Sequence, residues 1–97
     1  MALLIKADGT EVAVVPEGEG RRLTYAQVRE AIGGGYVEAV ATDPAKADGY
    51  SHIYLDEEGK LKRLPANAKA TAMSNYTMPG DVLCGDVLFC TSEEDMR

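Results

Sequence analysis

The two cysteines and the single histidine are the residues whose chemistry would be most distinctive in this chain. Cys84 and Cys90 lie in the stretch GDVLCGDVLFC. On one extended strand their Cα atoms would be about 20 Å apart, whereas a disulfide requires a separation below about 7 Å. A structural zinc site needs four ligands, and two cysteines with His52 supply only three. We therefore interpret the stretch as a strand that closes a sheet, bent at Gly85, with both thiols acting as small core side chains.

Catalysis by His52 is the alternative use of these residues. A nucleophile needs a base beside it, and His52 with Cys84 or Cys90 would form such a dyad. A lone histidine at the start of a strand is more often exposed or satisfied by structural contacts. The acidic turn at residues 56–58 offers paired carboxylates, but a general acid needs burial to raise its pKa, and a turn of this kind is normally solvated. We favour a protein that is not an enzyme, and we assign it no cofactor and no metal.

The segment KLKRLPANAKATAMSNY, residues 60–76, is the strongest candidate for a ligand site. It combines basic residues with hydroxyl and amide side chains and contains no acid. A short helix is predicted over residues 67–73 with Asn67 as its cap, and its first N–H groups could meet an anion, with Arg63 as a bidentate partner. The alternative is a capped surface helix in a basic neighbourhood. The candidate ligand-binding residues are Arg63, Asn67, Lys69 and Thr71.

Composition and charge narrow the class of protein. Ninety-seven residues, of which 45% are hydrophobic and 27% charged, are typical of one small globular domain over residues 1–97. The net charge of −6 argues against general binding to nucleic-acid backbones. Acidic residues gather in 36–58 and 81–97, which are either solvated faces or contact surfaces for a partner. The first residues lack the features of a signal peptide or membrane span, so we expect a cytoplasmic protein with reduced thiols.

The pattern of apolar residues predicts an α+β fold with a small, mostly antiparallel sheet of hairpins. Asp8-Gly9 between two apolar runs predicts an opening hairpin with a type I′ turn. The tail, residues 92–97, is predicted to be frayed. Strands are expected over residues 2–7, 10–15, 36–42, 52–56, 60–64 and 81–90.

The best-specified element is a helix that begins after Thr24. Thr24 and Gln27 have the spacing of a capping box, and Leu23 and Val28 have that of a hydrophobic staple. The glycines at 33–35 follow the helix, so an anion there would meet its negative end, and we interpret them as a C-cap. This helix should cover one face of the sheet. Its predicted apolar face consists of Tyr25, Val28 and Ile32.

Four blocks of the chain carry a family resemblance: ALLI, LTYAQVREAIGGGYVEAV, LDEEGKLKRLPANAKATAM and GDVLCGDVLF. They resemble the small bacterial, phage and mobile-element proteins of domain of unknown function 3846. Members carry Gly-Tyr after the helix, as at Gly35-Tyr36, and an Asn followed by Ala-Thr, as at Asn67 and Ala70-Thr71. Residues 42–52 would be an inserted loop of unusual length. The resemblance implies a fold and a phage or mobile-element setting, and it implies no reaction.

These features favour a small non-enzymatic binding module of phage or mobile-element type, which acts on an unknown protein partner or forms a homo-oligomer. The alternative is a protein that sequesters an anionic, nucleotide-like ligand at residues 60–76. That alternative predicts a concave pocket containing Arg63, Asn67 and Lys69. It also predicts that Arg63→Ala abolishes binding without unfolding the protein.

Overall fold

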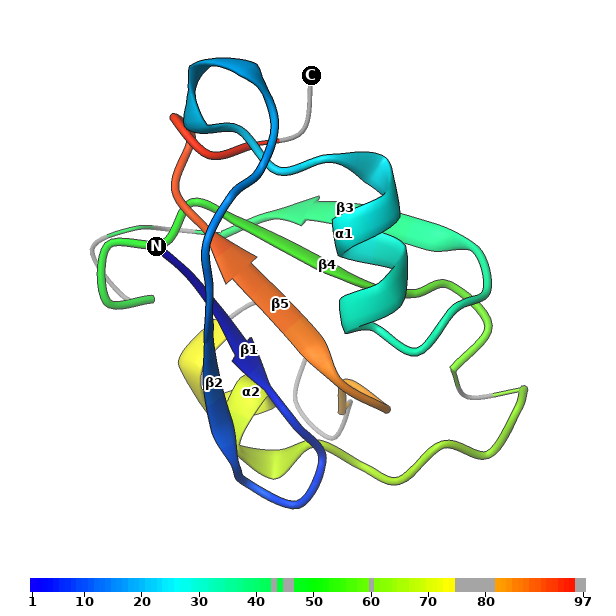
Figure 1. The fold of residues 1–97 in the computed structure, drawn as a ribbon. Coiled ribbons are helices and arrows are strands. Elements are labelled where there is room, and N and C mark those ends of the chain that lie inside the picture. Colours follow the sequence, from blue (N-terminus) through cyan, green and yellow to red (C-terminus); the bar gives the residue numbers. More distant parts are fainter. Residues whose placement is uncertain (43, 45–46, 60, 75–81, 96–97) are drawn as a thin grey trace.

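Five strands form one antiparallel sheet in the order β2-β1-β5-β4-β3 (Figure 1). The computed structural model describes residues 1–42, 44, 47–59, 61–74 and 82–95. The strands are β1 (Ala2–Ile5), β2 (Glu11–Val14), β3 (Val37–Ala41), β4 (His52–Asp56) and β5 (Val87–Cys90). The helices are α1 (Tyr25–Ala31), α2 (Ala68–Ser74) and a 3-10 turn, η1 (Glu19–Arg21). The predicted α+β class, with a small antiparallel sheet and two short helices, is confirmed.

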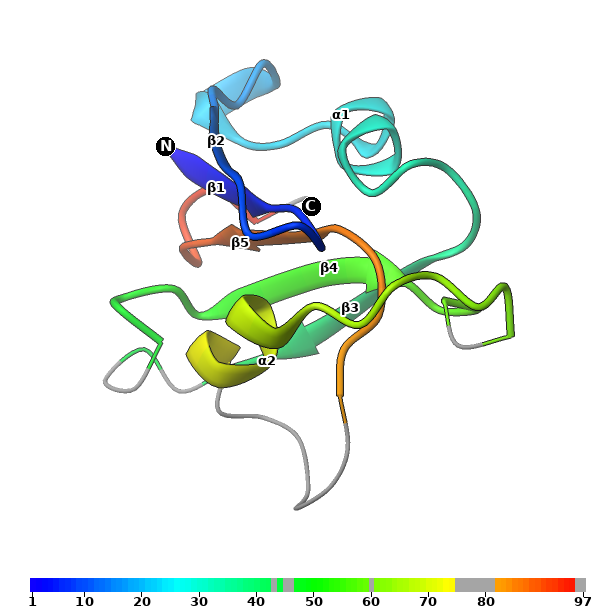
Figure 2. The ribbon, with the colours of Figure 1, turned by 90° about the horizontal axis from the view of Figure 1, so that it is seen from below.

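The helices α1 and α2 lie on opposite faces of the sheet (Figure 2). Strands β4 and β5 are consequently covered on both sides, and every residue from Ile53 to Asp56 and from Val87 to Cys90 is buried. The core on the α1 side consists of Ala2, Leu4, Leu23, Val28, Ile32, Tyr54, Leu88 and Cys90. The core on the α2 side consists of Ile5, Ile53, Leu55, Ala70, Leu83, Val87 and Phe89.

The opening hairpin of β1 and β2 is confirmed, but its turn differs from the prediction. Gly9 N donates to Lys6 O at 2.8 Å, and Lys6 N donates to Thr10 O at 2.9 Å. Gly9 has a φ of 91°, whereas Asp8 is not among the residues with positive φ. A type I′ turn needs positive φ at both central residues, so that prediction was wrong. The loop is longer than two residues, and a single glycine in the left-handed region is sufficient for it.

The capping box of α1 is confirmed. Thr24 Oγ1 accepts from Gln27 N at 3.1 Å, and Gln27 Oε1 accepts from Thr24 N at 3.3 Å. Val28 and Ile32 are buried as predicted, but Tyr25 is 54% exposed, so its assignment to the apolar face was wrong. Side chains of a helix lean toward its N-terminus. Tyr25 is the first residue of α1, and its ring therefore projects past the end of the helix.

The strand predicted over residues 60–64 is not formed by the described residues 61–64, and Lys60 lies outside the described residues. This segment instead makes local turns, in which Lys62 N donates to Glu58 O at 2.9 Å and Leu64 N donates to Gly59 O at 3.0 Å. Strand β4 pairs with β3 on one side and β5 on the other. It has no free edge for a further strand, which explains why the prediction was wrong.

The last part of the chain is more firmly held than predicted. Within the described part of 81–90, Cys84 forms only an isolated bridge with Ala66, the chain bends at Gly85, which has a φ of 84°, and β5 follows. Residues 92–95 are not frayed, because Leu23 N donates to Glu94 O at 2.9 Å and the residues Glu94 and Asp95 are buried. The predicted turn at Pro79-Gly80, like residues 96–97, lies outside the described residues.

Candidate functional site

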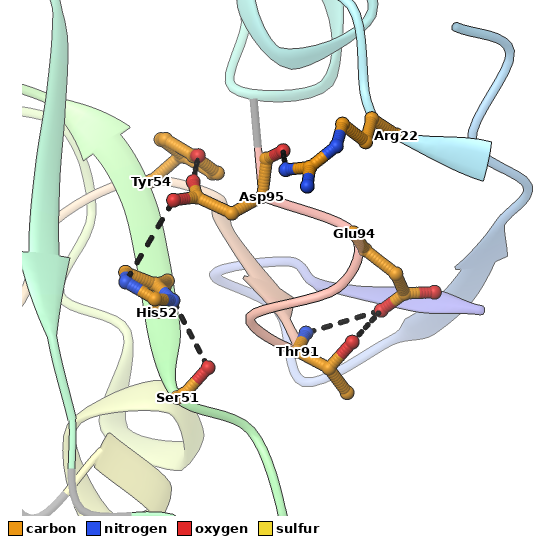
Figure 3. Close-up of polar contacts among 7 residues, drawn as sticks. All are labelled: Arg22, Ser51, His52, Tyr54, Thr91, Glu94 and Asp95. Carbon is orange, nitrogen blue, oxygen red and sulfur yellow. Dashed lines mark hydrogen bonds and ion pairs between the residues drawn. The ribbon is translucent and has the colours of Figure 1, made fainter. Parts of the chain in front are cut away.

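A polar cluster joins the C-terminal turn to the start of β4 (Figure 3). Asp95 is buried, and its carboxylate accepts a hydrogen bond from the Tyr54 hydroxyl. The other carboxylate oxygen lies 3.8 Å from His52 Nε2, and Ser51 Oγ lies 2.9 Å from His52 Nδ1. Arg22 Nη1 donates to the main-chain oxygen of Asp95 at 3.2 Å. This cluster was not predicted from the sequence, because Asp95 lies in the tail that was expected to be frayed.

Serine, histidine and aspartate are the residue types of a nucleophilic triad, so the geometry of the cluster decides its chemistry. A distance of 3.8 Å between His52 Nε2 and Asp95 is an ion-pair distance and is too long for a hydrogen bond. Ser51 bonds to the neighbouring histidine from the adjacent position in the chain. The described part of the chain has surface hollows at α1 and the β1–β2 hairpin, at the C-terminal turn, beside Tyr36 and at the C-terminal end of α1, and none of these four is lined by a residue of the cluster. These contacts hold the C-terminal turn against the sheet and are therefore structural.

Cys90 faces His52 across the β4–β5 pair. Burial, together with the negative charge of Glu94, raises the pKa of the Cys90 thiol to about 12. A thiol that stays protonated at neutral pH is a poor nucleophile. Both cysteines are free thiols, and Cys90 belongs to the core on the α1 side. Within the described part of the chain, no group of three or more potential metal ligands is present.

Glu94 anchors the C-terminal turn from within. Its Oε1 accepts from Thr91 N at 3.1 Å and from Thr91 Oγ1 at 3.2 Å, and its Oε2 lies 2.8 Å from the ammonium group of Met1. Burial raises the pKa of the Glu94 carboxyl, but the ammonium group and the Thr91 donors outweigh burial, so the pKa lies below its ordinary value. The carboxylate form is therefore the one that the fold stabilises.

We expect Glu94→Gln to lower the free energy of unfolding by about 1–2 kcal/mol at pH 7, because hydrogen bonds to a charged group are among the stronger ones. Since the folded-state pKa is lowered, the carboxylate contributes stability above its unfolded-state pKa, and this contribution disappears as the pH falls through the folded-state pKa. Urea denaturation should show the difference from wild type shrinking below about pH 4. The exposed neighbour provides the control Glu93→Gln, which should change stability by less than about 0.5 kcal/mol. A loss that does not vary with pH would contradict this account.

The acidic turn after β4 differs from the solvated turn that was expected. Asp56 is buried, its Oδ1 accepts from Glu58 N at 2.9 Å, and its Oδ2 lies 2.8 Å from Lys62 Nζ. Burial raises the pKa of Asp56, but the Lys62 ammonium and the Glu58 N–H together lower this pKa by more, so the net shift is downward. Asp56, Glu94 and Asp95 are thus buried inside the two acidic segments and contribute little to an acidic contact surface.

Two of the four predicted ligand-binding residues, Asn67 and Thr71, lie together beneath the sheet. Asn67 is fully buried; its Nδ2 donates to Ile5 O at 2.8 Å and to Gly85 O at 2.9 Å. Its Oδ1 accepts from Ala70 N at 3.0 Å, which confirms Asn67 as the cap of α2. Thr71 Oγ1 donates to the carbonyl of Asn67 at 2.7 Å. These side chains join β1, the bend at Gly85 and α2.

The other two predicted residues lie apart from this pair. Lys69 forms an ion pair with Glu11 of β2, and Arg63 is exposed in the turn after β4 with a φ of 56°. None of the four hollows described here is lined by Arg63, Asn67 or Lys69. Residues 60, 75 and 76 of the segment lie outside the described residues. The assignment of this segment to an anionic ligand stays a prediction.

A hollow of about 440 Å³ lies between α1 and the β1–β2 hairpin and is open to solvent. Its apolar lining consists of Leu4, Val12, Val14 and Ala31, its polar lining of Lys6, Glu17, Gln27, Glu30 and Asp86, and Gly33 also lines it. Of the other three hollows, one lies at the C-terminal turn, one lies between Tyr36 and the turn that contains Glu57, Glu58 and Leu61, and one lies at the C-terminal end of α1.

The fold and its polar clusters define a small α+β domain whose buried polar side chains hold loops and helix ends onto one sheet. A family model described as Domain of unknown function (DUF3846) matches residues 1–97, and the chain belongs to this family. The resemblance seen in the sequence is thereby confirmed. Neither a comparison with curated proteins nor one with solved structures found a match. Among the described residues, no helix has the length and apolar character required to cross a membrane.

Proposed function

We propose that the protein is a small non-enzymatic interaction module that binds an extended segment of a partner polypeptide along the outer edge of β2. The observation that carries this proposal is the position of β2 at the end of the sheet (Figure 1). Val12 and Val14 of this strand also line the hollow between α1 and the β1–β2 hairpin. Val12 on this strand is 39% exposed, and Val15, which directly follows the strand, is 63% exposed. An open edge with apolar side chains is a template for the addition of another strand.

The hairpin register identifies the main-chain groups that the edge presents. The bond from Lys6 N to Thr10 O places this pair in the hydrogen-bonded set, and such pairs alternate along an antiparallel ladder. Val12 and Val14 therefore direct their main-chain groups toward β1, whereas Glu11 and Ala13 direct theirs outward. A partner strand can form its hydrogen bonds with Glu11 and Ala13.

The edge of β2 that is open to a partner ends at a fixed point on each side. Gln27 Nε2 donates to Val15 O at 2.7 Å, and Gln27 Oε1 accepts from Glu17 N at 2.9 Å, so α1 holds the chain where β2 ends. At the other end the hairpin turn closes the strand. The opposite edge of the sheet, β3, exposes the small side chains Ala39 and Ala41, and none of the four hollows is lined by a residue of β3. The β2 edge is therefore the better docking surface.

A pair of proline substitutions tests the proposal. Proline at an outward-facing position removes a donor from the free edge but no bond from the existing ladder. Peptides that bind the wild type are first selected from a displayed library of random linear sequences. Ala13→Pro should lower the affinity of these peptides by about tenfold or more, the equivalent of about 1.4 kcal/mol. Ala39→Pro is the matched control, because the Thr42 N to Ser51 O bond puts Ala39 in the equivalent outward position of β3. Failure to enrich any peptide, or equal losses in both variants, would contradict strand addition at β2.

The alternative function, sequestration of an anionic nucleotide-like ligand, has less support. The polar atoms of Asn67 and Thr71 are bonded within the fold, and Lys69 is paired with Glu11. The phage or mobile-element setting and the cytoplasmic location stay predictions from the sequence.

A further inference from the structure

We infer that the segment that adds to β2 carries a lysine or arginine two residues before an apolar residue, and that it belongs to another polypeptide rather than to a second copy of this chain. This inference rests on the proposed strand addition and specifies its partner.

The charge around the hollow favours a cationic partner. Three carboxylates, those of Glu17, Glu30 and Asp86, line it together with one ammonium group, that of Lys6. The chain as a whole has a net charge of −6. An excess of carboxylates at a docking surface attracts cationic partners and raises their rate of association. A basic segment is therefore favoured over an acidic or a neutral one.

The direction of the side chains on β2 determines where an apolar partner residue fits. Leu4 pairs with Val12, so both point to the α1 face, and Val14, two residues further along, points the same way. Directly opposite residues of neighbouring strands point to the same face. A partner residue opposite Val12 therefore projects toward the α1 face, where an apolar side chain covers Val12, which is 39% exposed.

The positions of Glu17 and Glu30 indicate where the basic residue of the partner lies. Gln27 contacts both Val15 and the main chain of Glu17, so Glu17 lies at the Val14 end of the hollow. Glu30 follows Gln27 by three positions on α1 and shares its side of the helix. In an antiparallel partner, the residue opposite Val14 comes two positions before the residue opposite Val12. A long cationic side chain at that position extends toward the hollow that Glu17 and Glu30 both line.

A second copy of the chain fits this surface poorly. In a symmetric antiparallel pair centred on Ala13, Val12 of the partner copy would lie opposite Val14, where a basic residue is favoured. The outward main-chain groups of Glu11 would meet Val15, whose carbonyl already accepts from Gln27. Such a pair would also bring two chains of net charge −6 together.

Two synthetic peptides test the inference, one built on the repeat Lys-Thr-Val-Thr and the other on Glu-Thr-Val-Thr. Fluorescence anisotropy should show the lysine peptide binding about tenfold more tightly at about 0.05 M salt, with the difference largely lost at about 0.5 M because exposed charges are screened. Glu30→Lys should reduce the preference for the lysine peptide. Glu38→Lys, the same change at an exposed position of β3, should leave it unaltered. Ala13→Pro should weaken the binding of the lysine peptide.

The outcomes separate this inference from the proposed function. Equal binding of the two peptides, weakened in both by Ala13→Pro, would overturn the basic partner and leave strand addition standing. Binding of the lysine peptide that Ala13→Pro does not weaken would overturn both proposals. If neither peptide binds, the inference of a basic partner is wrong. Strand addition itself is then tested separately by the peptides selected from the displayed library. A wild-type dimer in sedimentation that Ala13→Pro dissociates would identify a second copy as the occupant and overturn the inference.

Discussion

Asn67→Ala is expected to lower the free energy of unfolding by about 3–4 kcal/mol. The substitution removes the side-chain donor to the carbonyl groups of Ile5 and Gly85. It also removes the acceptor that caps α2 at Ala70 N. A buried polar group that loses its partner costs about 1–3 kcal/mol, and loss of a cap costs about 1 kcal/mol. Urea denaturation followed by circular dichroism measures the change.

Asn67→Asp separates the two roles of this side chain. Aspartate is as good a helix cap as asparagine, but at neutral pH it has no donor for the carbonyls of Ile5 and Gly85. We therefore expect Asn67→Asp to remain destabilised by about 2 kcal/mol or more at pH 7. If Asn67→Ala changed stability by less than about 1 kcal/mol, the side chain would not be the structural link that its contacts indicate, and the ligand-binding prediction would gain support.

The elements that could be predicted from the sequence are those whose determinants lie within a few residues. The capping box of Thr24 and Gln27 and the cap of α2 at Asn67 depend on side chains three positions from the N–H groups they bond. The Asp8-Gly9 hairpin depends on one turn. Local sequence specifies such features because the interacting groups are brought together by the element itself.

The elements that could not be predicted depend on contacts between distant parts of the chain. The alternation in residues 60–64 is typical of a strand, but β4 is already paired on both sides by β3 and β5. The polar cluster joins Asp95 to His52 and Tyr54, which are more than forty residues away. No local pattern marks Asp95 as buried, because the four residues before it, 91–94, are all polar or acidic.

The predicted ligand site shows a different limit. Asn67 and Thr71 were predicted to bind a ligand because of their residue types, but the type of a side chain reports only its capacity for hydrogen bonding. Their partners are main-chain groups of β1, the bend at Gly85 and α2 itself. The sequence alone cannot distinguish a side chain that binds a ligand from one that joins segments of the chain.

Gly35→Ala is expected to lower the free energy of unfolding by about 3–4 kcal/mol. Gly35 has a φ of 88°, in the left-handed region where an L-residue costs about 1–2 kcal/mol. A Cβ there would also lie 2.6 Å from Lys62 Nζ and 2.7 Å from Asp56 Oδ2. Lys62 is long and can move into solvent, but Asp56 is short, buried and bonded to Glu58 N. Displacing Lys62 would leave the buried carboxylate without its cation, which is strongly unfavourable.

Gly34→Ala is the matched control, because Gly34 has a φ of 92° and no atom lies within 4 Å of its Cβ position. Gly34→Ala should lower the free energy of unfolding only by the cost of an L-residue in the left-handed region, about 1–2 kcal/mol. The pKa of Asp56 is lowered in the wild type, so its carboxylate contributes stability above the unfolded-state pKa that is lost as the pH falls through the folded-state pKa. Gly35→Ala should therefore also flatten the dependence of stability on pH below about pH 5, whereas Gly34→Ala should not. Equal losses in the two variants, with unchanged pH dependence, would show that the ion pair rearranges freely and that Gly35 is required only for its backbone conformation.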